Sequence, residues 1–195
     1  MTAELHARKF LVILVTLLGM TGLACARTMT VGKGEGYDYG AIQVAINAAQ
    51  AGDTVIVARG TYETRIDFKG KNITLTSENP NSSAVVGDTI IRAGDGWNMV
   101  PVVTFKGSED ERCVLQGFTI SNGEDIDYGA GILGNGTRAT ISHCVVSDNQ
   151  ARIAGGGIHD CDGTIRDSTI RNNGIRLHNR PGRGGGLSDC DFNGV

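Results

Sequence analysis

The segment GGGIHDCDGTI at residues 155–165 returns, with few changes, as GGGLSDCDFNGV at residues 184–195. A more distant copy, GAGILGNG, occupies residues 129–136. A second pattern, a strand with an Asn-rich exit, alternates with these Gly-rich segments: LQGFTISNG from Leu115, ISHCVVSDN from Ile141 and IRDSTIRNN from Ile165. Corresponding residues recur at intervals that vary from one repeat to the next, which is typical of constant strands joined by variable loops.

The repeats predict a solenoid wound from short parallel strands. In ISHCVVSDN the candidates for the interior are Ile141, Cys144 and Val146. A step of three followed by a step of two indicates a corner or a bulge between two strands. No segment has the helical length that a βαβ crossover needs. Coils of about 25 residues with several short strands each fit a stack in which neighbouring strands lie about 4.8 Å apart.

Stacked coils place equivalent residues in columns. The column Phe118, Cys144 and Ser168 is expected inside the solenoid. A second column, near a turn, has side chains that tolerate a left-handed backbone and can bond to their neighbours above and below: Asn122, Asp148 and Asn172.

The N-terminal part predicts a cap for the solenoid. Within YGAIQVAINAAQAGD (39–53), apolar residues recur at helical spacing and Gly52 ends the helix. We expect this short amphipathic helix, in a segment spanning 27–52, to cover the open end of the first coil. The next strand is expected at 53–62, and coils are expected over 53–195. The helical face consists of Ile42, Ala45, Ile46 and Ala49.

Residues 1–26 have the features of a signal peptide. Arg8 and Lys9 precede the apolar run FLVILVTLL, which is short for a bilayer span, and Ala24-Cys25-Ala26 fits signal-peptidase cleavage after Ala26. Lipidation of Cys25 is the alternative. No other apolar run is long enough to span a membrane. The mature chain is therefore expected to be secreted, periplasmic or at the cell surface.

Residues 41–91, AIQVAINAAQAGDTVIVARGTYETRIDFKGKNITLTSENPNSSAVVGDTII, resemble the N-terminal region of exported right-handed parallel β-helix proteins of the pectin-lyase-like superfamily. This stretch is also similar to the start of chondroitinase- and alginate-lyase-type polysaccharide lyases. The GGGI and Asn-rich strands resemble the repeats of polymorphic outer membrane proteins. The resemblance implies an all-β fold: a right-handed single-stranded parallel β-helix.

The resemblance is weaker for activity, because this fold carries many unrelated functions. The lyases abstract a proton beside a uronic acid carboxylate, with a Lys or Arg base and often Ca²⁺. No base and no calcium-binding set can be matched to residues of this sequence. We therefore expect a non-catalytic, glycan-binding, adhesive or structural surface protein, and the N-terminal part of a polysaccharide-active lyase or hydrolase is the alternative.

Composition limits the partners. The chain has 195 residues, 29 Gly, 3 Pro and 40% apolar residues, which indicates a folded, turn-rich protein rather than a disordered one. A net charge of −3 and the absence of a long Lys/Arg run give no indication of nucleic-acid binding. The last residue, Val195, corresponds to Ile165, so the sequence stops inside a repeat, and the open edge is expected to continue into further coils or to be closed by a partner.

The D-C-D segments form the first candidate site. Stacking places Asp160 on Asp189 and Asp162 on Asp191, and four close carboxylates could share a Ca²⁺ ion or bind a sugar. The alternative is that these aspartates are ordinary turn residues that accept backbone hydrogen bonds or face solvent. His159 beside them is expected to be a surface residue.

A basic loop is the second candidate. IRLHNRPGRGGG (175–186) carries Arg176, His178, Arg180 and Arg183, which could bind an acidic polysaccharide. The alternative is a solvated loop. Glu124, Asp125 and Asp127 form an acidic loop that is expected to be solvated as well.

The cysteines Cys161 and Cys190 occupy equivalent positions of two repeats. Their Cα atoms are expected about 5 Å apart, within disulfide range, but parallel Cα–Cβ vectors make the disulfide dihedral unfavourable. We therefore predict two close, buried thiols, with a disulfide as the alternative.

Overall fold

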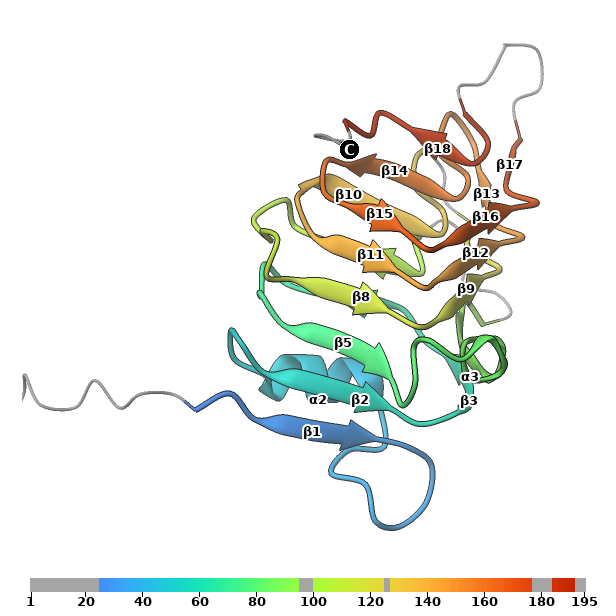
Figure 1. Cartoon of the computed structure of the whole chain (residues 1–195). Helices are drawn as coiled ribbons and strands as arrows, with labels where there is room; N and C mark the ends of the chain where they lie inside the picture. The colour runs from blue at the N-terminus through green and yellow to red at the C-terminus, as the bar shows by residue number, and fades with distance from the viewer. Residues whose placement is uncertain (1–24, 95–99, 125–126, 177–183, 192–195) are drawn as a thin grey trace, which may run out of the picture.

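The computed structural model describes residues 25–94, 100–124, 127–176 and 184–191. Within them the chain forms a parallel β-solenoid, confirming the predicted all-parallel architecture (Figure 1). Three stacked sheets run along it. Sheet A has six strands, one per coil, so the solenoid has about six coils. Its strands are β1 (Thr28–Val31), β2 (Thr54–Val57), β5 (Thr74–Ser77), β8 (Val114–Gln116), β11 (Thr140–Ser142) and β15 (Ile165–Arg166).

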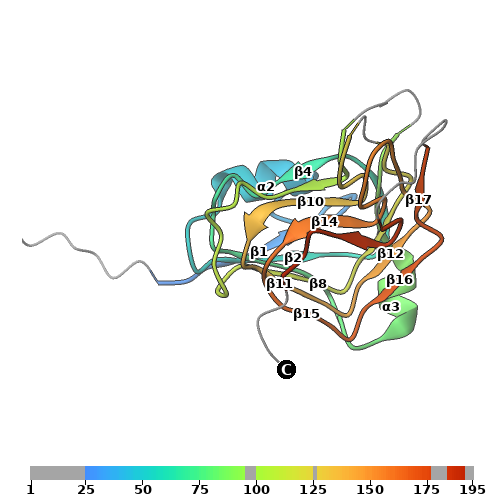
Figure 2. The ribbon, with the colours of Figure 1, turned by 90° about the horizontal axis from the view of Figure 1, so that it is seen from above.

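Sheets B and C have five strands each, and all strand pairs in them are parallel. Viewed along the stack, sheets A and C face each other and sheet B joins them at one end (Figure 2). Sheet B contains β3 (Gly60–Glu63), β6 (Thr89–Arg92), β9 (Thr119–Ser121), β12 (Val145–Ser147) and β16 (Thr169–Arg171). Sheet C contains β4 (Ile66–Asp67), β7 (Val103–Thr104), β10 (Ile132–Thr137), β14 (Ile158–Cys161) and β18 (Leu187–Ser188). A fourth, two-stranded sheet pairs β13 (Gln150–Ala151) with β17 (Gly174–Ile175).

The register confirms the predicted columns. Ile132 pairs with Ile158, which pairs with Leu187, so the copies of the Gly-rich segment lie on consecutive coils. Leu115, Ile141 and Ile165 stack in the same way in sheet A.

The expected interior column is buried in its first two members. Phe118 and Cys144 are buried, whereas Ser168, near the end of the described stack, is half-buried. The Oγ of Ser168 accepts a hydrogen bond from the backbone N–H of Cys144 at 3.1 Å. The polar side chain therefore satisfies a backbone donor of the coil below it.

Left-handed residues make the corners. Between the two strands of each repeat, where the sequence predicted a change of direction, one residue has φ between 52° and 81°. These residues are Gly117, His143 and Asp167. Sheet B ends at a second such column, at Asn122, Asp148 and Asn172, with φ between 54° and 58°. The short polar side chains of Asn and Asp make them the commonest non-glycine residues in this conformation. The Asn-rich exits of the repeats therefore follow from the turn they have to make.

The corner before sheet C needs glycine. Gly129, Gly155 and Gly184 have φ of 64°, 59° and 51°, and a Cβ at Gly155 would lie 2.7 Å from the carbonyl oxygen of Ile158. An Asn or Asp would clash at this corner, and this explains why the repeats begin with Gly here and end with Asn or Asp elsewhere.

An internal hydrogen-bond ladder lies one residue after the column that the sequence pattern indicated. Asn149 is fully buried, and its Nδ2 donates to the carbonyls of Ile120 and Ser147 and to Oδ1 of Asn173. Its Oδ1 accepts from the backbone N–H of Gly123 at 2.8 Å. The left-handed residue makes the turn and the following Asn satisfies the turn's backbone groups.

Helix α2 (Ile42–Ala48) lies beside β4 on the sheet C side of the first coil (Figure 2). Its buried residues are Ile42, Ala45 and Ile46. The side chain of Gln43 pairs with the edge of β4: its Oε1 accepts from the N–H of Asp67 at 2.7 Å and its Nε2 donates to the carbonyl of Asp67 at 3.1 Å. The amide group thus occupies the place of a further strand at this edge.

The C-terminal end of α2 is held by a cation from a later coil. Lys71 Nζ donates to the carbonyl oxygens of Ile46, Asn47 and Ala49 at 2.7–2.8 Å. A cation in this position satisfies the carbonyls left unpaired at the helix end and complements the helix dipole.

Two local expectations were wrong or incomplete. Residues 53–62 form two strands, β2 and β3, because the chain turns a corner at Ala58–Arg59 before Gly60, where φ is 152°. Helix α3 (Ser83–Asp88) had not been expected; Ser82 caps it by accepting from the N–H of Val85 at 3.4 Å.

We expect Asn149→Ala to lower the free energy of unfolding by about 2 kcal/mol or more, because buried backbone groups of two coils lose their partner. Urea denaturation measures this loss. Asn81→Ala, in an exposed turn, is the matched control and should leave the midpoint unchanged. Equal midpoints for both variants would contradict a structural role for the ladder.

The buried carboxylate of Asp53 should make the free energy of unfolding fall at low pH. This buried carboxylate accepts hydrogen bonds from the backbone N–H groups of Arg27 and Gln50, which hold its pKa below the ordinary value. Because the folded-state pKa is depressed, the stabilisation is present above about pH 4 and is lost as the pH falls through the folded-state value. Asp53→Asn should flatten the pH dependence of the free energy of unfolding below about pH 4, whereas Asp88→Asn, at an exposed carboxylate, should not. Parallel curves for wild type and Asp53→Asn would refute this assignment.

Candidate functional site

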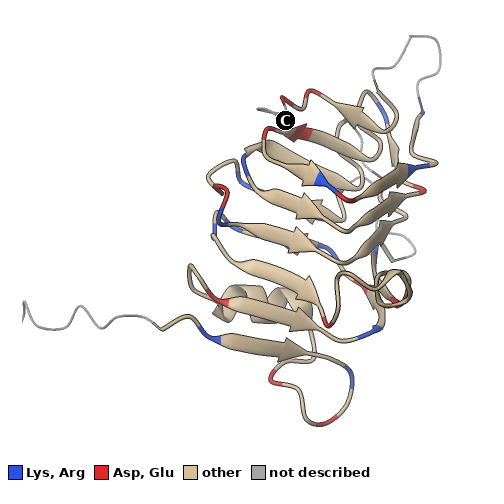
Figure 3. Ribbon diagram, viewed as in Figure 1, with Lys and Arg blue, Asp and Glu red and all other residues tan. Residues whose placement is uncertain are grey.

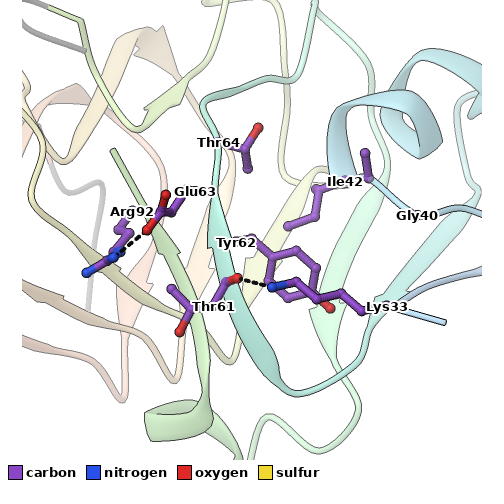
Figure 4. Close-up of a pocket in the computed structure, with 9 residues that line it drawn as sticks. Lys33, Gly40, Ile42, Thr61, Tyr62, Glu63, Thr64 and Arg92 are labelled. Carbon is purple, nitrogen blue, oxygen red and sulfur yellow. Dashed lines mark hydrogen bonds and ion pairs between the residues drawn. The ribbon is translucent and has the colours of Figure 1, made fainter. Parts of the chain in front are cut away.

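A hollow opens on the first coils, at the corner where β3 leads into β4. This first-coil pocket has a volume of about 700 Å³ (Figure 4). Four segments build it: the loop after β1, the start of α2, strand β3 and strand β6. Its lining includes Lys33, Ile42, Thr61, Tyr62, Glu63, Thr64 and Arg92.

Charged groups line the first-coil pocket in paired positions. Lys33 Nζ donates to the carbonyl of Thr61 at 3.0 Å and lies 6.0 Å from the centre of the Tyr62 ring. Arg92 forms an ion pair with Glu63 across the β3–β6 pair (Figure 4). Both cations are thereby oriented, because each is held on one side by a neighbouring oxygen.

Tyr62 forms the floor of the first-coil pocket. Its ring is buried, its hydroxyl donates to the carbonyl of Ala58 at 2.8 Å, and burial raises the pKa of the phenol. Tyr62 therefore stays a neutral phenol at physiological pH.

A second hollow, the sheet C groove, has a volume of about 390 Å³. Gln43 and Arg65 line the groove, and their chain neighbours Ile42 and Thr64 line the pocket. Lys106 Nζ and Asp67 Oδ2 are 3.2 Å apart in this groove. Its lining also includes Ile66, Val100, Pro101, Thr104 and Leu133. Neither hollow was identified from the sequence, because neither follows a repeat.

The structure describes all four aspartates of the predicted calcium site, at or just after the ends of β14 and β18. Asp160 and Asp189 both have a left-handed backbone, with φ of 55° and 49°. Asp162 Oδ1 accepts from the backbone N–H of Asp191 at 3.2 Å, and Asp189 Oδ2 accepts from the hydroxyl of Ser188 at 3.0 Å. These are the contacts of turn aspartates.

No group of three or more His, Cys, Asp or Glu side chains that could hold a metal ion is present in the described part of the chain. Calcium binding at this column stays a prediction from the sequence. Backbone conformation and backbone hydrogen bonds do explain why Asp recurs on both sides of the cysteine in the segments IHDCD and LSDCD.

His159 lies between two partners on the outer face of sheet C. Its ring stacks on Tyr128, with centroids 4.6 Å apart, and its Nδ1 lies 3.5 Å from Asp189 Oδ2. The histidine is half-buried rather than fully exposed. It joins two coils through Tyr128 below and Asp189 above.

The predicted glycan-binding loop is described only at its start. Arg176 Nη2 lies 3.0 Å from Glu124 Oε1, and Arg176 Nε donates to Gln150. His178, Arg180 and Arg183 lie outside the described residues, as does Asp125. Arg176 thus links the predicted basic loop to the predicted acidic loop.

Cys161 and Cys190 are free thiols on adjacent coils, but the prediction that both are buried is wrong for Cys190. The backbone N–H of Cys161 donates to Cys190 Sγ at 3.4 Å. Cys161 is buried, whereas Cys190 is only half-buried.

Charge is spread over the molecule. Lys and Arg alternate with Asp and Glu, mostly at corners and strand ends (Figure 3). The cations of the two hollows therefore stand out by their position in concave surfaces and not by a large positive field.

Comparison with known proteins gives no family: no family model, no curated protein and no solved structure matches the chain. Among the described residues, no helix is both long enough and apolar enough to cross a bilayer.

The left-handed backbone at Asp160 allows a test of whether the aspartate column serves the turn or binds calcium. We expect Asp160→Asn to keep the melting temperature, because Asn tolerates the left-handed backbone, and Asp160→Val to lower it by several degrees, because a β-branched residue does not. Calcium should leave the melting temperature of the wild type unchanged. A calcium-dependent rise that disappears in Asp160→Asn/Asp189→Asn would show instead that the column is a metal site.

Proposed function

We propose that this chain is an exported or cell-surface β-helix protein of the pectin-lyase-like type, right-handed, with α2 as its N-terminal cap, that binds an acidic polysaccharide without cleaving it. The observation that supports binding is the pair of adjoining hollows at the β3–β4 corner, lined by Lys33, Arg92, Arg65 and Lys106. Right-handed winding is the strong preference of crossovers between parallel strands.

Size and chemistry suit a saccharide. The first-coil pocket falls within the range of small-ligand sites, and the sheet C groove is lined in part by the next residues along the chain, Gln43 and Arg65. Ammonium and guanidinium groups that are already oriented by a carbonyl or carboxylate can donate further hydrogen bonds to sugar hydroxyls and carboxylates at a low entropic cost. Glu63 and Asp67 beside them supply acceptors for hydroxyl groups.

The alternative function is the N-terminal part of a polysaccharide lyase or hydrolase. The contact that favours it is Lys106 with Asp67 in the sheet C groove, since a cation and a carboxylate side by side are the groups that proton transfer at a uronic acid requires. Both groups are held in an ion pair, which favours binding over proton abstraction.

We expect the chain to bind polygalacturonate and to bind its methyl-esterified form at least about tenfold more weakly, since an oriented charge-assisted hydrogen bond contributes about 1.5–3 kcal/mol. Lys33→Met should weaken polygalacturonate binding by a similar factor in isothermal titration calorimetry. Arg112→Gln removes a cation that pairs with Asp110 outside both hollows and should bind like the wild type.

The same polymer distinguishes the two functions. A lyase creates a carbon–carbon double bond that absorbs in the ultraviolet, and a hydrolase releases reducing ends without that absorbance. Either product, lost in Lys106→Ala, would replace the binding proposal by the enzymatic one. Unchanged affinity in Lys33→Met, or equal affinity for the esterified polymer, would remove the first-coil pocket as the site.

A further inference from the structure

Two thiols meet at the last described coils. Cys161 ends β14, and Cys190 follows β18 at the equivalent position, because Ile158 pairs with Leu187 and His159 with Ser188. The backbone N–H of Cys161 donates to Cys190 Sγ at 3.4 Å, so the sulfur of one coil touches the backbone of the cysteine on the other. Neighbouring parallel strands are about 4.8 Å apart, which lies within the Cα separation of disulfide-bonded cysteines. The parallel Cα–Cβ vectors make the dihedral of such a bond unfavourable, so the pair is expected to be reduced until an external oxidant closes it.

The two sulfurs differ in access to solvent. Cys161 is 1% exposed, and its Sγ lies 3.8 Å from the carbonyl oxygen of His159. Cys190 is half-buried, and its Sγ lies 3.3 Å from the carbonyl oxygen of Ser188. A reagent in solution therefore reaches Cys190 first. By contrast, Cys113 and Cys144 are both buried.

We propose that Cys161 and Cys190 are a redox-active thiol pair, in which Cys190 is the attacking thiol and Cys161 the resolving thiol, and that low-molecular-weight disulfides convert the pair into a disulfide linking two coils. This proposal is independent of glycan binding.

The reaction balances with the external disulfide as oxidant. The Cys190 thiolate attacks one sulfur of the disulfide RSSR, which forms a Cys190–SR mixed disulfide and releases RS⁻. The Cys161 thiol then loses its proton and attacks the Cys190 sulfur, which forms the Cys161–Cys190 bond and releases the second RS⁻. Two electrons pass from the two cysteines to RSSR, and both released thiolates take up protons according to their pKa.

The electrostatics favour this division of roles. Hydrogen bonding from Cys161 lowers the pKa of the Cys190 thiol to about 7, although its partial burial opposes the shift. The same contact, together with burial and the charges of Asp160 and Asp162, raises the pKa of Cys161 well above its ordinary value. At neutral pH a substantial fraction of Cys190 is therefore thiolate, the nucleophilic form, while Cys161 stays protonated until the mixed disulfide has formed.

The test uses the full chain carrying Cys25→Ser, because Cys25 is an exposed thiol. The reduced protein is incubated with oxidised glutathione and followed by intact mass and peptide mapping. We expect the loss of about 2 Da, for two hydrogens, and one linked peptide pair containing Cys161 and Cys190. The disulfide closes a loop of about 30 residues and should raise the melting temperature by about 5 °C or more.

Two variants separate the roles. Cys161→Ser should stop at a stable glutathione adduct on Cys190, and Cys190→Ser should stay unmodified over the same time. Alkylation of the folded chain by iodoacetamide should label Cys190 first, with a rate that reaches half its maximum near pH 7. Adduct formation on Cys161 in Cys190→Ser, or a Cys25→Ser chain that keeps its four remaining thiols free under oxidised glutathione, would overturn the proposal.

Discussion

The left-handed backbone at the corners is the constraint on which the rest of this fold depends. A coil of three short strands closes only if the chain changes direction within one or two residues. It does so at Gly117, His143 and Asp167 and again at Asn122, Asp148 and Asn172. Each such residue bears a conformational cost of about 1–2 kcal/mol unless it is Gly, Asn or Asp. Stacking repeats that choice in every coil, which is why turn residues and not apolar residues dominate the visible periodicity.

Each corner also creates backbone groups that need partners inside the solenoid. Asn149 meets this need with bonds to neighbours on the coils below and above, including Gly123 below and Asn173 above. Ser168 performs the same task for Cys144. Polar residues are therefore buried at fixed positions beside an otherwise apolar interior, in which Phe68 stacks on Phe105 with ring centroids 4.5 Å apart. The corner conformation and the ladder occur together, because the turn that leaves N–H groups unpaired also places an amide side chain beside them.

The sequence predicted the repeated part of this fold and not its irregular parts. Columns such as Ile132, Ile158 and Leu187 could be found because each coil imposes the same steric demand on its residues. The position of the internal ladder was off by one residue, since Asn suits both the left-handed turn and the interior, and composition alone does not separate the two roles. Helix α3 and the division of residues 53–62 occur once each, so no repeat indicated them. The two hollows escaped prediction for the same physical reason, because Lys33, Tyr62 and Arg92 come from separate segments and share no spacing.

Residues with functional chemistry should therefore be sought where a column is interrupted. Helix α2 is one interruption: Gln43 stands where another strand of sheet C would lie, and both hollows open beside it. The thiol pair is another. Cys161 pairs in register with Thr137 on the coil below. The equivalent position on the coil above is Cys190, so the column consists of a hydroxyl followed by two thiols. A small buried residue would satisfy the packing at this position, as Thr137 does. The second thiol therefore adds chemistry that packing does not demand, and Cys190 is the more exposed thiol of the two.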